Sequence, residues 1–179
     1  MKKFEEKTIG SQAIYNGKII SLKVDDVTLP NGQVSKREIV NHPGAVAVIA
    51  ITDEGKLIVV EQYRKPLERS IIEIPAGKLE PGEEPAITAA RELEEETGFG
   101  CKELTYLQSF ATSPGFADEI IHLFVARGLY EIEDRAAMDE DEFVELMEIT
   151  VEEGERMVAE QKIFDAKTAF AILWMKMQG

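Results

Sequence analysis

The chain has 179 residues, enough for one large domain or for one domain with a small appendage. Its 34 acidic residues outnumber its 20 basic residues and no basic cluster stands out, which argues against a nucleic-acid partner. No apolar run approaches the roughly 18 residues of a membrane-spanning helix, so no membrane partner is expected. The N-terminus lacks the apolar stretch of a signal peptide, and the single cysteine, Cys101, cannot form an intramolecular disulfide. Both features favour a cytoplasmic location.

The first part of the chain alternates short β-like runs with turn signals. Asn16-Gly17 and Pro30-Asn31-Gly32 are strong turn sequences. Strands of an antiparallel meander are expected near residues 12–15, 18–29 and 33–41. His42-Pro43-Gly44 then interrupts the pattern. The sequence therefore predicts a small N-terminal β-domain over residues 1–42 and a second domain over residues 43–179.

The second part mixes strands and helices. The run Ala45–Ile51 is continuously apolar, as a buried central strand is. Further strands are expected at residues 57–63, 71–74, 104–111, 120–126 and 143–149. A helix is expected from Pro85 to Thr97, because proline suits a first turn and Gly98 suits the position after the last. Two helices close the chain, the first with a capping box that starts at Thr150 and the second with Asp165 as N-cap. This order predicts a mixed sheet with helices, of the α/β or α+β class.

The last helix carries an apolar stripe at helical spacing, which is expected to face the core or another subunit. The stripe consists of Ala166, Ala169, Phe170, Leu173, Trp174 and Met177.

The helix over residues 85–97 carries an unusual set of carboxylates. At 3.6 residues per turn, Glu92, Glu95 and Glu96 share one face. Their mutual repulsion costs stability, and a divalent cation would remove that cost. Hard oxygen ligands without nearby His or Cys favour Mg²⁺, with Mn²⁺ as a substitute. A solvated acidic face is the alternative. The core is expected on the other side of the helix, at Ala86, Ala90, Leu93 and Thr97.

The residues around this helix resemble the Nudix box at every fixed position, as Gly77-x5-Glu83-x7-Arg91-Glu92-Leu93-x-Glu95-Glu96-x-Gly98-Phe99. The resemblance implies a mixed β-sheet between helices. It also implies an enzyme that hydrolyses a nucleoside diphosphate linked to another moiety.

Segments outside the box resemble the ADP-ribose pyrophosphatase branch of this family. They are Ser35–Glu38, Glu61–Arg64, Glu73–Gly77, Thr112–Gly115 and Asp139–Glu142. The branch implies a small-molecule substrate, ADP-ribose or a similar nucleoside diphosphate sugar, cleaved to AMP and ribose 5-phosphate. It also implies a homodimer that exchanges or shares the N-terminal β-domain. One alternative is a Nudix hydrolase of another nucleoside diphosphate derivative. The other is a non-catalytic Nudix domain that binds a ligand.

The resemblance assigns expected roles to the box residues. Glu92, Glu96 and the carbonyl of Ala76 would bind the metal, and Glu95 would support the cluster. Glu83 would be an additional ligand or would lie just behind the ligands. Arg91 would orient the glutamates through charge-assisted hydrogen bonds, with a helix-surface ion pair as the alternative.

Residues outside the box are expected to complete the site. Glu140 or Glu142 would supply a further carboxylate. One of the two would bind metal and the other would deprotonate water, and the choice between them stays open. The alternative is that both belong to a solvated acidic turn. Arg37 and Arg64 would bind the substrate's phosphates. An ordinary surface position is the alternative for each substrate residue. The expected contacts to the rest of the substrate come from Glu38, Gly115 and Glu119.

Overall fold

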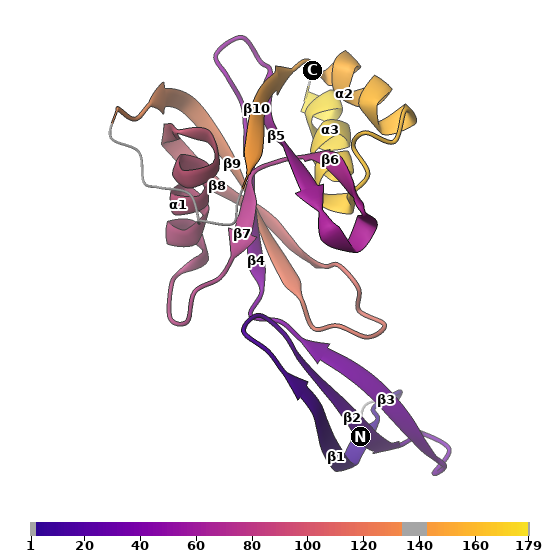
Figure 1. Cartoon of the computed structure of the whole chain (residues 1–179). Coiled ribbons are helices and arrows are strands. Elements are labelled where there is room, and N and C mark those ends of the chain that lie inside the picture. Colours follow the sequence, from indigo (N-terminus) through magenta and orange to yellow (C-terminus); the bar gives the residue numbers. More distant parts are fainter. Residues whose placement is uncertain (1–2, 134–142, 179) are drawn as a thin grey trace. The chain divides into compact units, whose positions relative to one another are not determined.

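The computed structural model of the chain describes residues 3–133 and 143–178. They form two compact units, which can be followed in Figure 1. The first unit consists of Met1–Gly44 and Phe110–Ile120, and the second of Ala45–Ser109 and Ile121–Gly179. No helix in the described ranges is both long and apolar enough to cross a bilayer.

A three-stranded antiparallel sheet, in the order β1-β2-β3, dominates the first unit. Its strands are β1 (Lys7–Asn16), β2 (Ser21–Thr28) and β3 (Val34–Asn41). The turns fall at the predicted glycines: the N–H of Gly17 donates to the carbonyl of Ile20 at 2.9 Å, and Gly32 has a φ of 84°, which favours glycine. The predicted meander is confirmed. Strand β1 starts earlier than expected because its residues are almost all exposed and show no apolar alternation.

The second unit contains two sheets. One has the order β7-β4-β9-β8, in which β4 runs parallel to β9 and antiparallel to β7; the other has the order β10-β5-β6. The strands are β4 (Ala45–Ala50), β5 (Leu57–Arg64), β6 (Arg69–Glu73), β7 (Ala76–Lys78), β8 (Phe99–Ala111), β9 (Ile120–Glu131) and β10 (Val144–Ile149). A 3₁₀ turn, η1 (Lys65–Leu67), joins β5 to β6. Strand β4 is buried along its whole length, as its apolar sequence predicts.

The helices are α1 (Pro85–Thr97), α2 (Val151–Ala159) and α3 (Ala166–Gln178). Helix α1 packs on β4 and β7, and α3 packs on β6 and α2 (Figure 1). The predicted bounds of α1 are confirmed, with Gly98 in the left-handed region at its end. Thr150 forms the predicted capping box, and Asp165 accepts a hydrogen bond from the N–H of Thr168 at 3.1 Å. The expected mixed sheet with helices is confirmed.

The predicted core face of α1 is partly wrong. Leu93 is buried, but Ala86 and Ala90 are exposed. Glu92 and Glu96 lie on the buried face beside Leu93. Two carboxylates can face inward because hydrogen-bond donors of the protein meet them there, which a count of apolar residues does not anticipate.

The predicted stripe of α3 is not the face that this chain buries. Leu173 and Met177 are exposed. The buried residues are instead Lys167, Thr168, Ala171, Ile172 and Met175. Because α3 is apolar nearly all round, its periodicity does not determine which face is buried. The polar partners of Lys167 and Thr168 determine it instead. The oligomer-face interpretation of the stripe stays a prediction.

Candidate functional site

The backbone of β7 lies against two carboxylates of α1. The N–H of Ala76 donates a hydrogen bond of 3.0 Å to Oε2 of Glu96. A Cβ atom built on Gly77 would lie 1.9 Å from Cδ of Glu92, so only glycine leaves room for that carboxylate. This close approach gives a physical reason for the glycine that begins the motif.

Both carboxylates are buried, and burial of a charge is costly unless it is paired. The exposed fraction is 7% for Glu92 and 4% for Glu96. Glu95, on the same side of the helix, is half-buried. The structure therefore brings the carboxylates together in a place where they must be compensated.

Arg91 supplies much of this compensation. Its Nη1 donates to Glu92 at 2.9 Å and to Glu95 at 2.7 Å, and its Nη2 donates to Glu83 at 3.3 Å. Burial opposes the charged guanidinium, but these carboxylates outweigh it and raise the pKa of Arg91. One cation thus joins three of the predicted site carboxylates.

Glu83 is held from a second direction. The Oγ1 hydroxyl of Thr88 donates to it at 2.8 Å. The hydrogen bonds from Thr88 and Arg91 lower the pKa of Glu83, so it carries its negative charge at neutral pH. Thr88 was not predicted from the sequence. Its position five residues after Glu83, inside the first helical turn, is the only signal that could have found it.

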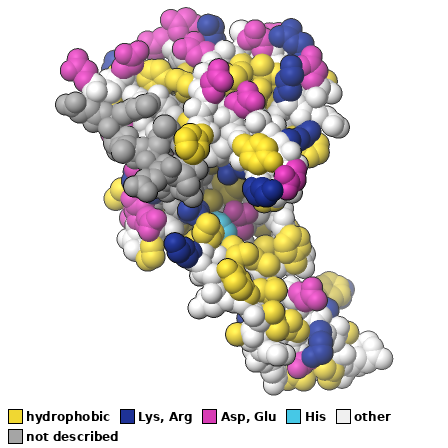
Figure 2. Space-filling model, in the orientation of Figure 1, with side chains coloured by type: hydrophobic (Ala, Val, Ile, Leu, Met, Phe, Trp, Pro, Cys, Tyr) yellow, Lys and Arg dark blue, Asp and Glu magenta, His cyan; other side chains and the backbone are white. Residues whose placement is uncertain are grey.

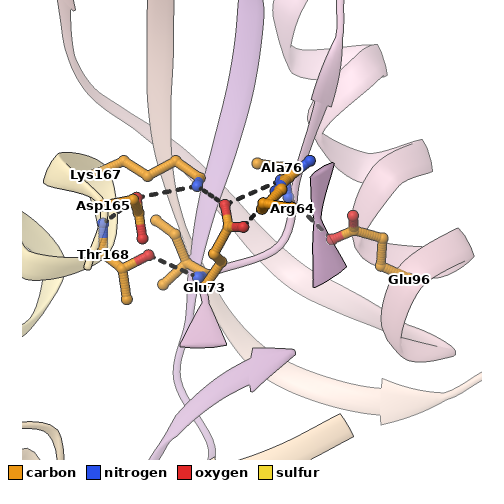
Figure 3. A network of polar contacts seen from close by, with 8 residues as sticks. Arg64, Glu73, Ala76, Glu96, Asp165, Lys167 and Thr168 are labelled. Atoms are coloured by element: carbon orange, nitrogen blue, oxygen red, sulfur yellow. Dashed lines mark hydrogen bonds and ion pairs between the residues drawn. The ribbon is translucent and has the colours of Figure 1, made fainter. Parts of the chain in front are cut away.

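Arg64, at the end of β5, lies beside the same site (Figure 3). Its Nε and Nη2 donate to the two oxygens of Glu73 at 2.5 and 3.0 Å. Burial opposes the charge, but Glu73 raises the pKa of Arg64, and the charges of Glu96 and Asp165 add to the effect. The charge of Glu96 is therefore close enough to act on Arg64.

Two residues of this cluster were missed by the roles predicted from the sequence. Glu73 links Arg64 to Lys167, which comes from α3. Glu73 is the first residue of the Glu73–Gly77 segment, and that resemblance is the signal that could have found it. For Lys167 the signal is weaker: it is a charged residue on a mostly apolar helix.

Four predicted substrate residues belong to the first unit, whereas the box belongs to the second. Arg37 forms a two-pronged ion pair with Glu6, at 2.8 and 2.6 Å. Glu38 lies in β3, and Gly115 has open space around it. Glu119 accepts a hydrogen bond from Thr112. Their contacts with substrate stay predictions.

The predicted loop carboxylates Glu140 and Glu142 lie outside the described residues. Within the described ranges, no group of three or more His, Cys, Asp or Glu side chains converges as a complete metal site. Glu92, Glu96 and Ala76 offer only oxygen donors, which suit a hard divalent cation. The space that Gly77 leaves at Glu92 fits the same interpretation. The residues present therefore fit part of a divalent-metal site.

The chain is similar to known proteins over almost its whole length. Residues 41–168 match the model of the NUDIX domain, and residues 6–40 match that of the nucleoside diphosphate sugar hydrolase N-terminal domain. An ADP-ribose pyrophosphatase of Bacillus subtilis (strain 168) is 60% identical over 99% of this chain and 96% of its own length. A protein of Bacillus methanolicus named methanol dehydrogenase activator is 62% identical over the same shares.

A solved structure has the same fold. The crystal structure of an ADP compounds hydrolase superposes with a TM-score of 0.85 and covers 100% of this chain and 99% of its own, at 23% identity. At that identity the likeness shows the fold alone.

The chain belongs to the Nudix family, and its fold is the Nudix fold. It is a Nudix hydrolase, and the predicted resemblance to the ADP-ribose pyrophosphatase branch is confirmed. Members of the family generally use divalent metal ions.

Proposed function

We propose that this chain hydrolyses the diphosphate bond of ADP-ribose, or of a similar nucleoside diphosphate sugar, with Mg²⁺ as its metal and Mn²⁺ as a substitute. The products are AMP and ribose 5-phosphate. The observation that carries the proposal is the pair of buried carboxylates, Glu92 and Glu96, held against Ala76–Gly77. The B. subtilis relative, with its printed name, supports the choice of substrate.

The reaction needs a nucleophile and a way to neutralise an anionic diphosphate. Bound divalent cations lower the pKa of a water molecule and balance the phosphate charge. Glu92 and Glu96 would hold the metal together with the carbonyl of Ala76, and Glu83 would be a further ligand. Arg91 keeps Glu92 and Glu95 in position through its hydrogen bonds.

Further groups handle the substrate. Arg64 binds a phosphate group, and a carboxylate of Glu140 or Glu142 accepts the proton of the attacking water. The water oxygen forms a bond to one phosphorus, and the bond from that phosphorus to the bridging oxygen breaks. The bridging oxygen leaves with the other phosphate group and takes up a proton, so that both products are monophosphates. In this way an acidic protein binds an acidic substrate, because cations lie between the two.

The first unit contributes specificity in this proposal. Arg37 binds a phosphate, and Glu38, Gly115 and Glu119 contact the remainder of the substrate. The chain acts as a cytoplasmic homodimer in which the N-terminal sheet is shared between subunits. Light scattering after size-exclusion chromatography tests the homodimer, and the molar mass of a monomer would overturn this part of the proposal.

The main experiment is turnover of ADP-ribose with and without Mg²⁺, on the wild type and on Glu96→Gln. The variant keeps the size of the side chain but removes a buried charge, so we expect kcat to fall by about 10²-fold or more. Glu152→Gln, at an exposed glutamate in the first turn of α2, is the matched control and should keep full activity.

Each outcome has a clear meaning. Metal-dependent AMP release that is lost only in Glu96→Gln supports the proposal. Activity on another diphosphate, such as an oxidised nucleotide or a dinucleoside polyphosphate, keeps the hydrolase and overturns the substrate. Binding of nucleotides without any turnover favours the non-catalytic alternative.

A second candidate function comes from the B. methanolicus relative, which is 62% identical to this chain. We infer that the same site is compatible with activation of a methanol dehydrogenase. The rate of such an enzyme, measured with the wild type and with Glu96→Gln, tests this. Activation by the wild type but not by Glu96→Gln would show that activation depends on hydrolysis. Activation by neither protein would exclude this second function.

A further inference from the structure

Glu73 is a buried carboxylate shared by two cations from different elements (Figure 3). Its side chain, at the end of β6, is only 4% exposed. Arg64 of β5 binds both of its oxygens, and Nζ of Lys167 donates to Oε2. Burial raises the pKa of Glu73, but the hydrogen bonds and charges of Arg64 and Lys167 outweigh burial and lower it. Glu73 is therefore an anion whose charge is divided between two partners.

Lys167 reaches this pair from α3 and lies 94 residues after Glu73 in the sequence. Its side chain is 9% exposed, and Nζ also donates to Oδ1 of Asp165 at 3.0 Å. A buried lysine is costly unless it is paired, and here Glu73 and Asp165 supply the pairing. With Arg64, Glu73, Lys167 and Asp165 all charged, the formal charges of the cluster cancel.

Arg64 is the member of this cluster that reaches solvent, with a side chain that is 40% exposed. Its Nε and Nη2 are occupied by Glu73, and no described residue forms a hydrogen bond with its Nη1. Figure 3 shows Glu73 on one side of Arg64 and Glu96 further away on the other. One nitrogen of the guanidinium is thus left for a ligand beside the box carboxylates.

We propose that Lys167 is a positioning residue for substrate binding: by taking part of the charge of Glu73, it leaves Arg64 with positive charge for a phosphate group. This inference rests on the proposed function, in which Arg64 binds substrate. Without Lys167, the cluster has one cation against two anions, and Glu73 neutralises Arg64 entirely. A diphosphate would then meet a negative surface beside Glu96.

A purely structural role for Lys167 is the competing explanation. Helix α3 has other anchors, however: the N–H of Ile74 donates to Oγ1 of Thr168 at 3.0 Å, and Ala171, Ile172 and Met175 are buried. A variant that lacks the charge of Lys167 therefore keeps these contacts of α3. This makes the charge testable apart from the packing.

The experiment compares KM and kcat for ADP-ribose among the wild type, Lys167→Met and Lys167→Arg. Methionine keeps much of the lysine's length without its charge, so we expect KM to rise about tenfold and kcat to change by less than about threefold. Lys167→Arg keeps the cation and should restore KM. Lys176→Met is the matched control: Lys176 lies on the same helix as Lys167, and its exposed ion pair with Glu155 of α2 is lost, which should leave both constants unchanged.

A double-mutant cycle separates positioning from structure. If Lys167 acts through Arg64, Lys167→Met changes KM no further in an Arg64→Met background. Effects that multiply in the double variant overturn the proposal. So does an unchanged KM in a Lys167→Met protein that has the circular dichroism spectrum of the wild type.

Calorimetric binding of α,β-methylene adenosine diphosphate with Mg²⁺ keeps this test apart from the proposed function. If the wild type binds this probe but does not hydrolyse ADP-ribose, the proposed function fails. Weaker binding of the probe by Lys167→Met would then still support the inference. If ADP-ribose is hydrolysed and Lys167→Met binds the probe as tightly as the wild type, only the inference fails. A wild type that neither binds the probe nor hydrolyses ADP-ribose overturns both.

Discussion

The carboxylate of Glu92 occupies the volume that any side chain at position 77 would need, since a Cβ built on Gly77 would lie 2.0 Å from its Oε1. Two residues fifteen positions apart in the sequence are therefore fitted to each other by packing. The backbone of Gly77 has an ordinary, negative φ, so the requirement for glycine here is one of space and not of backbone conformation.

Gly77→Ala is accordingly expected to displace Glu92 and to lower kcat/KM by about 10-fold to 100-fold, the range found when groups that orient metal ligands are removed. Steady-state kinetics at several Mg²⁺ concentrations measure this. Gly10→Ala is the control, because a Cβ there would meet nothing nearer than 3.5 Å. Equal activity of Gly77→Ala and the wild type would show that Glu92 has no required position.

Arg91→Met should make the stability of the protein depend more strongly on Mg²⁺. The substitution leaves Glu83, Glu92 and Glu95 without their shared cation. Because the guanidinium is about one-third exposed and thus screened, we expect a loss of about 1 kcal/mol in the absence of metal. A metal ion bound beside Glu92 would offset part of this loss.

Thermal unfolding in EDTA and in Mg²⁺ checks this prediction, with Arg156→Met as the control at an exposed ion pair of α2. A loss of the same size in both solutions would favour the alternative that Arg91 forms only a helix-surface ion pair.

Gly154→Ala tests the packing of α2 on α3. An added Cβ would lie 2.3 Å from Cδ1 of Ile172, which is buried. We expect a net destabilisation of about 1 kcal/mol, because the strain of overpacking exceeds the gain in helix propensity from glycine to alanine. Urea denaturation gives the free energy of unfolding.

Ile172→Val removes the Cδ1 atom in question. The double variant Gly154→Ala/Ile172→Val should therefore be more stable than the sum of the two single effects predicts. Strict additivity would mean that the two positions do not press on each other.

Glu73 should contribute a pH-dependent part of the stability. Burial raises its pKa, but Arg64 and Lys167 lower the pKa to below its ordinary value of 4.5. A carboxyl with a lowered pKa in the folded state stabilises the protein fully above the unfolded-state pKa of about 4.5. That contribution is lost as the pH falls through 4.5 towards the folded-state value.

The free energies of unfolding of the wild type and of Glu73→Gln, measured between about pH 7 and pH 3.5, test this sign. Their difference should narrow below about pH 4.5. A difference that stays constant, or widens, as the pH falls would mean that Glu73 is not stabilised in its charged form.

Local signals were enough to predict much of this protein from its sequence. Pro85 and Gly98 bound α1, Thr150 caps α2, and the continuous apolar run from Ala45 becomes the buried strand β4. These features depend on the backbone conformation and capping of residues that are neighbours in the sequence, so they can be predicted from a short segment alone. The spacing of the box residues likewise indicates the family without any knowledge of the geometry.

The sequence could not indicate which sides of α1 and α3 face inward. A rule that places apolar residues inside put Ala86 and Ala90 in the core, where the structure has Glu92 and Glu96. The rule fails because the energy of a buried charge depends on its partners, and those come from distant parts of the chain.

The sequence by itself determined the fold class, the ends of α1 and the group of residues in the box. Only the tertiary structure decided that Ala76 and Gly77 receive the carboxylates of α1, and that Lys167 reaches Glu73 from α3. The physical reason is that helix boundaries and strand patterns arise from local hydrogen bonding and periodicity, whereas a buried charge is stable only where the whole fold brings its counter-charge within hydrogen-bonding distance.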